Sequence, residues 1–416
     1  MTPGARRRAG SLAVAAVLAT ALSLGVGATT SPAAAAECEI GKTQYFDGQS
    51  QNLVRLGIPQ TWQLAQGKGV VVAVVDSGVN DDNAHFPDGV LLPGTSFVAG
   101  DTDGTGRTDA LGHGTAVAGI IAARALPRSF GSGMIGAAPA AQILPVRVFT
   151  RDQDVQPGET PLTGDNIARG IRWAVENGAD VINVSLSAPS TNTSLAEIKS
   201  ALALAEKRDV VVVASSGDSD GTERVEQRFP AAGRNVIGVA ATNAQGFVDD
   251  YSVHGEAVDV AAPGANVLVT FHGNGDCQTG PDVALTSWAA PFVAALAAQL
   301  RERFPKDSAE QIAYRILSTA ERPVAGQRDD DQGWGVIRPY EALTATFDTR
   351  RAGPAAPDQE KTEAVALEPT GARPMQATTD PLDPARREVL WWLIGGGGLA
   401  ALALVSRPLV ARARRD

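Results

Sequence analysis

The stretch ALTSWAAPFVAALAAQL, residues 284–300, predicts a turn that leads directly into a helix. Small apolar residues recur at helical spacing, and Pro291 is expected in the first turn, where its missing N–H costs nothing. Ser287 would then lie at the helix N-terminus, beside backbone N–H groups that have no intrahelical acceptor. A hydroxyl there is well placed to build negative charge on an attacked carbonyl. Taken alone, the stretch is equally consistent with a capped, buried helix.

Two further stretches carry side chains that could activate such a serine. The run VVVAVVDSGV, residues 70–79, predicts a buried parallel strand that ends at Asp76. The run GHGTAVAGII, residues 112–121, places His113 at the start of a helix of small residues. A nucleophilic serine needs a base within hydrogen-bond reach, and the base needs a partner that fixes its tautomer. Alone, Asp76 could be a turn carboxylate and His113 a packed core residue, but with Ser287 they favour a catalytic set.

The order Asp76, His113, Ser287 along the chain is that of the subtilisin triad, and with these motifs the sequence resembles the subtilisin-like serine proteases, or subtilases. The resemblance extends over roughly residues 60–340. It implies an α/β fold with a mostly parallel sheet and helices on both faces, in three layers. It also implies a serine endopeptidase that works through an acyl-enzyme on a polypeptide substrate, with no metal and no organic cofactor.

The hydrophobic pattern agrees with that fold class. Apolar strand candidates alternate with helical stretches, which predicts a parallel sheet covered by helices on both faces. In such a sheet the ligand crevice lies at the carboxyl ends of the strands. The expected strands are 70–75, 142–149, 181–186, 210–214, 236–240 and 258–260, and the expected helices are 114–125, 164–177, 194–207, 289–304 and 308–319.

Two short segments match the family's substrate-binding segments, which flank the primary specificity pocket. A peptide can add to such an edge as an extra strand through main-chain hydrogen bonds. The alternative is that both segments are ordinary strand ends. The residues concerned are Ser185, Leu186 and Ser187 in the first segment and Ser215, Ser216 and Gly217 in the second.

Three positions depart from the family pattern. Asp218 stands where the family normally has the Asn that donates to the oxyanion, and an ionised carboxylate can only accept hydrogen bonds. A protonated Asp218 in a dry site could donate instead. Leu285 replaces the Gly that precedes Thr-Ser, and Trp288 is bulkier than the usual residue after the serine. These departures leave two readings open: a weakened or selective protease, or a subtilase fold that serves mainly as a structural part of a complex.

The ends of the chain predict a membrane-tethered protein. Residues 1–36 have the basic, apolar and small-residue regions of a signal peptide, although an uncleaved anchor is the alternative. An extension (37–68) and the catalytic domain (69–347) follow, and then a Pro- and charge-rich linker (348–388) expected to be disordered. The apolar run 389–405 has about the minimum length for a membrane span. Arginines in the tail 406–416 predict a cytoplasmic C-terminus and an extracytoplasmic catalytic domain.

Composition and layout bear on partners. The 416 residues carry a net charge of −10, which does not suggest a nucleic-acid partner. The two cysteines, Cys38 and Cys277, would be exported together, which favours a disulfide over two separate thiols. A signal peptide, a subtilase domain and one C-terminal span together resemble the mycosins. That resemblance implies the cytoplasmic membrane and a type VII secretion membrane complex as partners. The other histidines have no motif around them and are expected at surface or packing positions: His85, His254 and His272.

Overall fold

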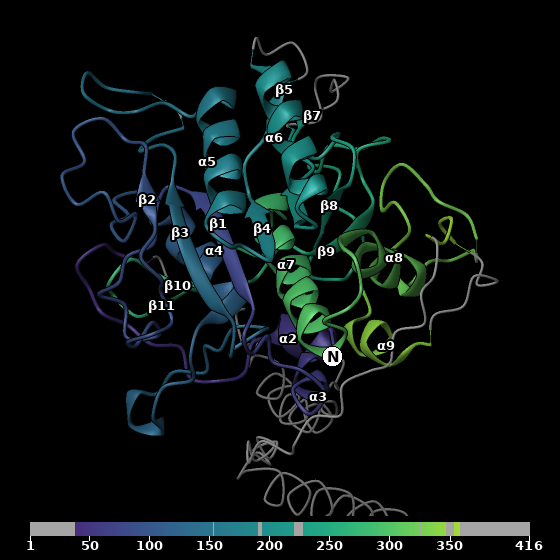
Figure 1. Ribbon diagram of the computed structural model, residues 1–416. Helices are drawn as coiled ribbons and strands as arrows, with labels where there is room; N and C mark the ends of the chain where they lie inside the picture. Colours follow the sequence, from purple (N-terminus) through teal and green to yellow (C-terminus); the bar gives the residue numbers. More distant parts are fainter. Residues whose placement is uncertain are drawn as a thin grey trace, which may run out of the picture. The chain divides into compact units, whose positions relative to one another are not determined.

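A parallel sheet of seven strands lies at the centre of the part of the chain that the structure describes, in the order β2-β3-β1-β4-β6-β8-β9 (Figure 1). The central strands are runs of Val, Ile and Ala buried on both sides, as expected for a parallel sheet under two helical layers. The sequence therefore predicted the parallel sheet and six of its seven strands, but not the two-residue strand at Thr95–Ser96. The strands are β1 (Val71–Asp76), β2 (Thr95–Ser96), β3 (Gln142–Arg147), β4 (Val181–Val184), β6 (Val211–Ser215), β8 (Val236–Thr242) and β9 (Val260–Pro263).

This computed structural model describes residues 38–152, 154–189, 194–219, 228–324, 326–346 and 353–357. The expected signal peptide, membrane span and cytoplasmic tail lie outside these residues, and so does the expected linker apart from 353–357. Within the described ranges, no helix combines the length and the apolar character needed to cross a membrane.

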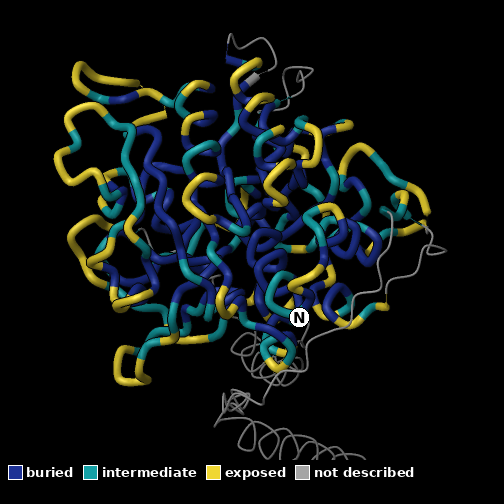
Figure 2. Tube along the Cα trace, viewed as in Figure 1, coloured by how far each residue is buried: buried dark blue, intermediate teal, exposed yellow. Residues whose placement is uncertain are grey.

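Helices cover both faces of the sheet and divide the core into two layers (Figures 1 and 2). Alternate residues of each strand point to opposite faces, so that Val72 and Val74 pack under one helical layer while Ala73 and Val75 pack under the other. The predicted three-layer arrangement is thus confirmed. The first layer contains α4 (His113–Ala122), α7 (Thr286–Arg303) and α8 (Ala309–Thr319), and the second contains α5 (Gly164–Glu176) and α6 (Leu195–Lys207).

Short elements complete the fold. Two antiparallel ribbons, β5–β7 and β10–β11, stand apart from the main sheet. Their strands have two or three residues each, too few for a period to show in the sequence. The elements are β5 (Ala188–Pro189), β7 (Arg228–Phe229), β10 (Leu268–Thr270), β11 (Asp276–Gln278), α2 (Gln51–Arg55), α3 (Ile58–Thr61), η1 (Arg128–Phe130) and α9 (Pro339–Thr344).

Helix α7 begins three residues earlier than the sequence predicted, at Thr286 instead of Ala289. Pro291 consequently lies in the second turn and not in the first, so the expectation that its missing N–H is harmless is wrong. In that turn a residue normally donates to the carbonyl four positions back, which here belongs to Ser287. The Ser287 carbonyl therefore needs another donor.

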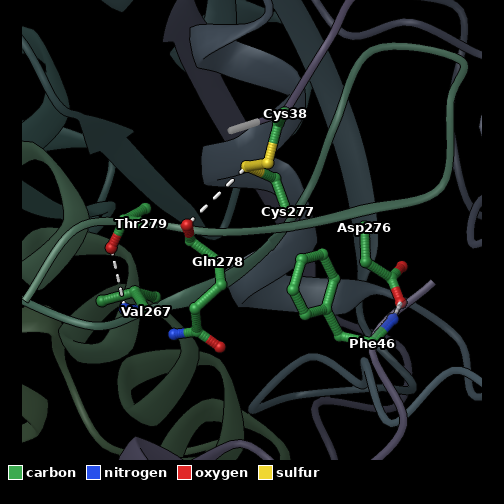
Figure 3. The surroundings of a disulfide bond; sticks show 7 residues. All are labelled: Cys38, Phe46, Val267, Asp276, Cys277, Gln278 and Thr279. Carbon is green, nitrogen blue, oxygen red and sulfur yellow. Dashed lines mark hydrogen bonds between the residues drawn. A yellow bond between two sulfur atoms is a disulfide. The ribbon is translucent and has the colours of Figure 1, made fainter. Parts of the chain in front are cut away.

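The N-terminal extension packs against the β10–β11 ribbon. A disulfide joins Cys38 to Cys277, with 5.9 Å between their Cα atoms (Figure 3). The Gln44 N–H donates to the Asn274 carbonyl and the Gln44 carbonyl accepts the Asp276 N–H. The Phe46 N–H donates to the Asp276 carboxylate at 3.3 Å (Figure 3). The pairing of the two cysteines is the one the sequence favoured.

Candidate active site

Asp76 and His113 are joined directly. Asp76 is the last residue of β1 and is fully buried, while the His113 side chain, at the start of α4, is 21% exposed. His113 Nδ1 lies 2.7 Å from Asp76 Oδ1, which also accepts the Ser77 N–H at 2.7 Å. Because the carboxylate holds a proton on Nδ1, Nε2 of the neutral ring is left as a proton acceptor. This pair has the geometry of an oriented general base.

The N-terminus of α4 is held in place by Asp109. Its two carboxylate oxygens accept the N–H groups of Gly112 and Thr115 at 2.8 and 2.9 Å, and Thr115 Oγ1 adds a bond of 2.7 Å. Asp109 therefore braces the turn that carries His113. Gly114 allows α4 to approach β1, since a Cβ at that position would lie 2.1 Å from the Gly78 carbonyl oxygen.

Ser287 is the second residue of α7, directly before the residue of that helix that contacts His113. Its neighbour Trp288 contacts the His113 ring, with 4.9 Å between ring centroids and 35° between ring planes. Among the hydrogen bonds of the described residues, none joins Ser287 Oγ to His113. Catalytic hydrogen bonds are often long in the absence of substrate and shorten when it binds. The structure thus joins Asp76 to His113 directly and brings Trp288, the neighbour of Ser287, to the same ring, while the role of Ser287 remains a prediction.

The main chain of Ser287 is held by a short hydrogen-bond chain from β4. Ser185 Oγ donates to the Ser287 carbonyl oxygen at 2.9 Å, which supplies the bond that Pro291 cannot make. Asn183 Nδ2 in turn donates to Ser185 Oγ at 2.9 Å. Sequence reasoning missed Asn183, although a polar residue inside the run VINV was a visible signal.

Asp218 lies just beyond β6 and caps α7. Its Oδ1 accepts the Thr286 N–H at 2.9 Å, so the carboxylate satisfies one of the unpaired donors at the helix N-terminus. Thr286 Oγ1 also accepts the Gly217 N–H at 3.3 Å. Leu285 has an ordinary extended backbone, with φ −96° and ψ 134°, so no glycine is required at that position. Sequence reasoning did not single out Thr286.

Burial and neighbouring charges shift the pKa values of both His113 and Asp218. Burial would lower the pKa of His113, but the Asp76 carboxylate, aided by Asp109 and Asp152, outweighs it and the pKa is raised. Burial raises the pKa of Asp218, although the Thr286 hydrogen bonds and the charges of Arg228 and His113 oppose the shift. A base that binds its proton more tightly therefore lies near a carboxyl that stays neutral to higher pH.

The predicted substrate-binding segments lie side by side at the ends of β4 and β6. They meet where Gly217 faces Ser187, since a Cβ on Gly217 would lie 3.1 Å from Ser187 Oγ. Ser216 is fully buried and Ser185 is turned toward the Ser287 carbonyl, so these two side chains are not free to contact a peptide. Leu186 and Ser215 are also buried. A role for these segments in substrate binding remains a prediction.

A second set of Asp, His and Ser side chains has a structural role. His85 and Asp276 are both fully buried, 2.7 Å apart from Nε2 to Oδ1, and Ser132 Oγ donates to Asp276 Oδ2 at 2.6 Å. His85 Nδ1 faces the Arg124 carbonyl at 2.7 Å. The side chains of His85 and Asp276 have no exposed surface, so the expectation of a packing role for His85 holds. The cluster anchors the loops beneath the disulfide.

Comparisons with known proteins agree with this geometry. The Subtilase family matches residues 67–335. Mycosin-1 of Mycobacterium tuberculosis is 34% identical over 374 residues, which cover 76% of this chain and 80% of that protein. Thermitase of Thermoactinomyces vulgaris is 34% identical over 278 residues, which cover 67% of this chain and 90% of thermitase. The solved structure of MycP1 from the ESX-1 type VII secretion system has a TM-score of 0.63 and 28% identity, covering 76% of this chain and 89% of that one.

Proposed function

Because the chain belongs to the subtilase family of serine endopeptidases, we propose that Ser287 is its nucleophile, His113 its general base and Asp76 the carboxylate that orients the base. The observation that carries this proposal is the 2.7 Å contact between His113 Nδ1 and the buried Asp76. It is supported by the contact between the His113 ring and Trp288, which follows Ser287 in the first turn of α7. The substrate is a polypeptide.

In this proposal Ser287 Oγ attacks the scissile carbonyl carbon while His113 Nε2 takes the hydroxyl proton. His113 then delivers that proton to the leaving amine, and an acyl-enzyme remains on Ser287. Water then attacks the acyl carbon while His113 Nε2 takes one of its protons. His113 returns that proton to Ser287 Oγ as the ester bond breaks and the acyl group leaves as a carboxylic acid. Asp76 stays ionised throughout and stabilises the imidazolium that forms twice in the cycle.

The oxyanion would be stabilised from the N-terminus of α7. The Thr286 N–H is used by Asp218 and the Trp288 N–H donates to the Leu285 carbonyl, while the Ser287 N–H has no acceptor within the first turn. That N–H and a neutral Asp218 are the two donors we propose. Ionised Asp218 would repel the developing charge, so the hole is weaker than one built with Asn.

We further propose that the protein is tethered to the cytoplasmic membrane, with the catalytic domain outside and the C-terminus in the cytoplasm. The signal-peptide pattern of 1–36, the apolar run 389–405 and the arginines after it support this layout. Similarity to mycosin-1 and to MycP1, whose solved structure is described as part of a type VII secretion system, supports an association with such a system. The substrate would then be a small set of exported proteins.

One observation favours a second function, a structural part of the secretion complex with little turnover. The Asp218 carboxylate caps α7 with the same group that would have to serve the oxyanion. A protein selected mainly as a scaffold could keep such a cap, because stability gains from it while catalysis loses.

Labelling with a serine-reactive phosphonate separates the two functions. The full chain, its Ser287→Ala variant and its Asp76→Asn variant are treated with the probe in membranes. Labelling of the wild type that is absent from Ser287→Ala and slowed in Asp76→Asn is expected for a working triad. The catalytic proposal is wrong and the scaffold is supported if two results occur together. The probe labels neither the wild type nor either variant, and wild type and Ser287→Ala restore secretion equally in a strain that lacks the protein.

A further inference from the structure

The side chain of Trp288 lies against the imidazole of His113. The ring centroids are 4.9 Å apart and the planes are inclined by only 35°, so the indole presents its face and not its edge. Trp288 is partly buried and packs on the core layer that contains α4, α7 and α8, while the His113 side chain is 21% exposed. The indole therefore covers part of the ring that would otherwise contact water.

The charged groups around His113 approach it from several elements. Asp76 at the end of β1 bonds Nδ1, and Asp109 in the loop before α4 and Asp152 beyond β3 act on the ring from further away. Asp218 beyond β6 interacts with its charge. On another side, the His272 ring lies against Gly112, where an added Cβ would meet its Nε2 at 2.5 Å. Trp288 adds a neutral aromatic face to this set of carboxylates.

We infer that Trp288 is a positioning residue for the proposed general base: its indole face holds the His113 ring and stabilises the imidazolium form by a cation–π interaction. The negative face of an indole attracts a cation within about 6 Å of its centroid, and the interaction strengthens when water is excluded. The inference rests on the proposed function only for its effect on rate. The effect on protonation of His113 stands without it.

A titration of His113 tests the interaction in the absence of turnover. The full chain is labelled with carbon-13 histidine in a Ser287→Ala background, and His113→Gln identifies the His113 signal among the four histidines of the chain. Trp288→Leu keeps an apolar cover over the ring but removes the aromatic face. We expect the pKa of His113 to fall by about 0.5 to 1.5 pH units, and Trp288→Phe to retain part of the difference.

Trp173→Leu provides the matched control, because Trp173 lies on α5 beneath the opposite face of the sheet. It should leave the His113 titration unchanged. An unchanged pKa of His113 in a folded Trp288→Leu protein would overturn the inference, and so would an equal fall in the Trp173 control.

Kinetics give a second signature that a purely structural role would not produce. In the Ser287-containing protein, Trp288→Leu should move the acid limb of kcat/KM to lower pH by the same amount as the titration. The plateau of kcat should fall by about two- to tenfold, with KM little changed, since less stabilisation reaches the imidazolium of the transition state. A shifted titration with no peptidase activity in any variant would contradict the proposed function while leaving the Trp288 contact established.

Discussion

At the scale of single residues, Asp218 is the position outside the proposed triad with the largest expected influence on turnover. Asp218→Asn keeps an oxygen that can accept the Thr286 N–H and adds an amide that always donates. Because one oxyanion donor is worth about 10²–10³ in kcat, we expect the variant to turn over a peptide amide at least about tenfold faster above the His113 pKa. Asp218→Ala, which has neither group, serves as the control. An Asn variant no faster than wild type would contradict the argument.

The same residue makes a prediction about pH. Burial raises the pKa of Asp218, so the neutral, donating form persists to higher pH than for an exposed carboxyl and is lost as pH rises through that pKa. Meanwhile the rate rises as His113 loses its proton. The wild type should therefore show a bell-shaped profile of kcat, and Asp218→Asn should lack its falling limb. Profiles of equal shape for the two proteins would show that Asp218 does not supply the donor.

Substitution of Ser185 tests whether its hydrogen bond to the Ser287 carbonyl supports the proposed nucleophile. Ser185→Ala leaves the Ser287 carbonyl without the donor that replaces the Pro291 N–H, and an unsatisfied buried acceptor costs about 1–3 kcal/mol. We expect a lower unfolding temperature together with a drop in kcat larger than the change in KM. Ser185→Thr, which retains the hydroxyl, should recover most of both. A rise in KM alone would instead support the substrate-binding role first predicted for Ser185.

The sequence predicted the residues that belong to recognisable motifs. It did not predict the roles of residues whose contacts depend on how distant segments pack together. Asp76, His113 and Ser287 lie in stretches whose pattern already indicates a strand end or a helix start. Trp288 was noticed only for its size, because a ring contact with His113 depends on the approach of α4 and α7. The cap formed by Asp218 could not be predicted for the same reason: it joins residues 68 positions apart.

At the scale of elements, the packing of α4 on β1 sets the distance between His113 and Asp76. A Cβ on Gly114 would lie 2.1 Å from the Gly78 carbonyl and 3.0 Å from the Asp76 Cβ, and neither is the end of a flexible side chain. Gly114→Ala should therefore move α4 off the strand and lower kcat by about tenfold or more, because even a misplacement of about 1 Å is costly. Gly280→Ala, where an added Cβ meets nothing within 4 Å, is the control and should match wild type in an activity assay.

The long elements followed from the sequence and their ends did not. Helices α5 and α6 match the expected ranges to within one residue, since apolar spacing and a polar first turn are local properties. Helix α7 starts early because its first residues are held by Ser185 and Asp218, which follow the neighbouring strands β4 and β6. A boundary fixed by such partners is invisible to a local pattern.

At the scale of the whole molecule, the disulfide fastens the extension to the catalytic domain. Its cysteines are 239 positions apart, and removing a disulfide that closes so long a loop costs about 2–5 kcal/mol. The Cys38→Ser/Cys277→Ser double variant should unfold at a lower temperature than wild type. Wild type treated with reductant should match the variant. Identical unfolding of oxidised wild type and double variant would show that the contacts of Gln44 and Phe46 alone hold the extension.

Stability should also depend on pH through Asp259, which lies far from the triad. Burial raises its pKa from 3.8 to about 6, although the Gly238 N–H and Arg328 oppose the shift. Since the folded state binds this proton more tightly, the stabilisation it contributes is complete below about pH 4 and is lost as pH rises through about 6. Asp259→Asn should then exceed wild type in denaturant stability above that range, by at most about 3 kcal/mol, and should equal it in acid. A constant difference across the range would rule out titration of Asp259 as the cause.

Helix α7 carries Ser287 in its first turn and then runs through the core layer that it shares with α4 and α8. Every residue from Ala289 to Leu300 is buried. The nucleophile therefore cannot fray away from an otherwise intact protein, because the rest of its helix is the centre of the hydrophobic layer. On heating, loss of peptidase activity and loss of the folded state should coincide in a single event. Evolution or engineering can accordingly retune such an enzyme through its surface loops, whereas any change along this helix is also a change in heat resistance.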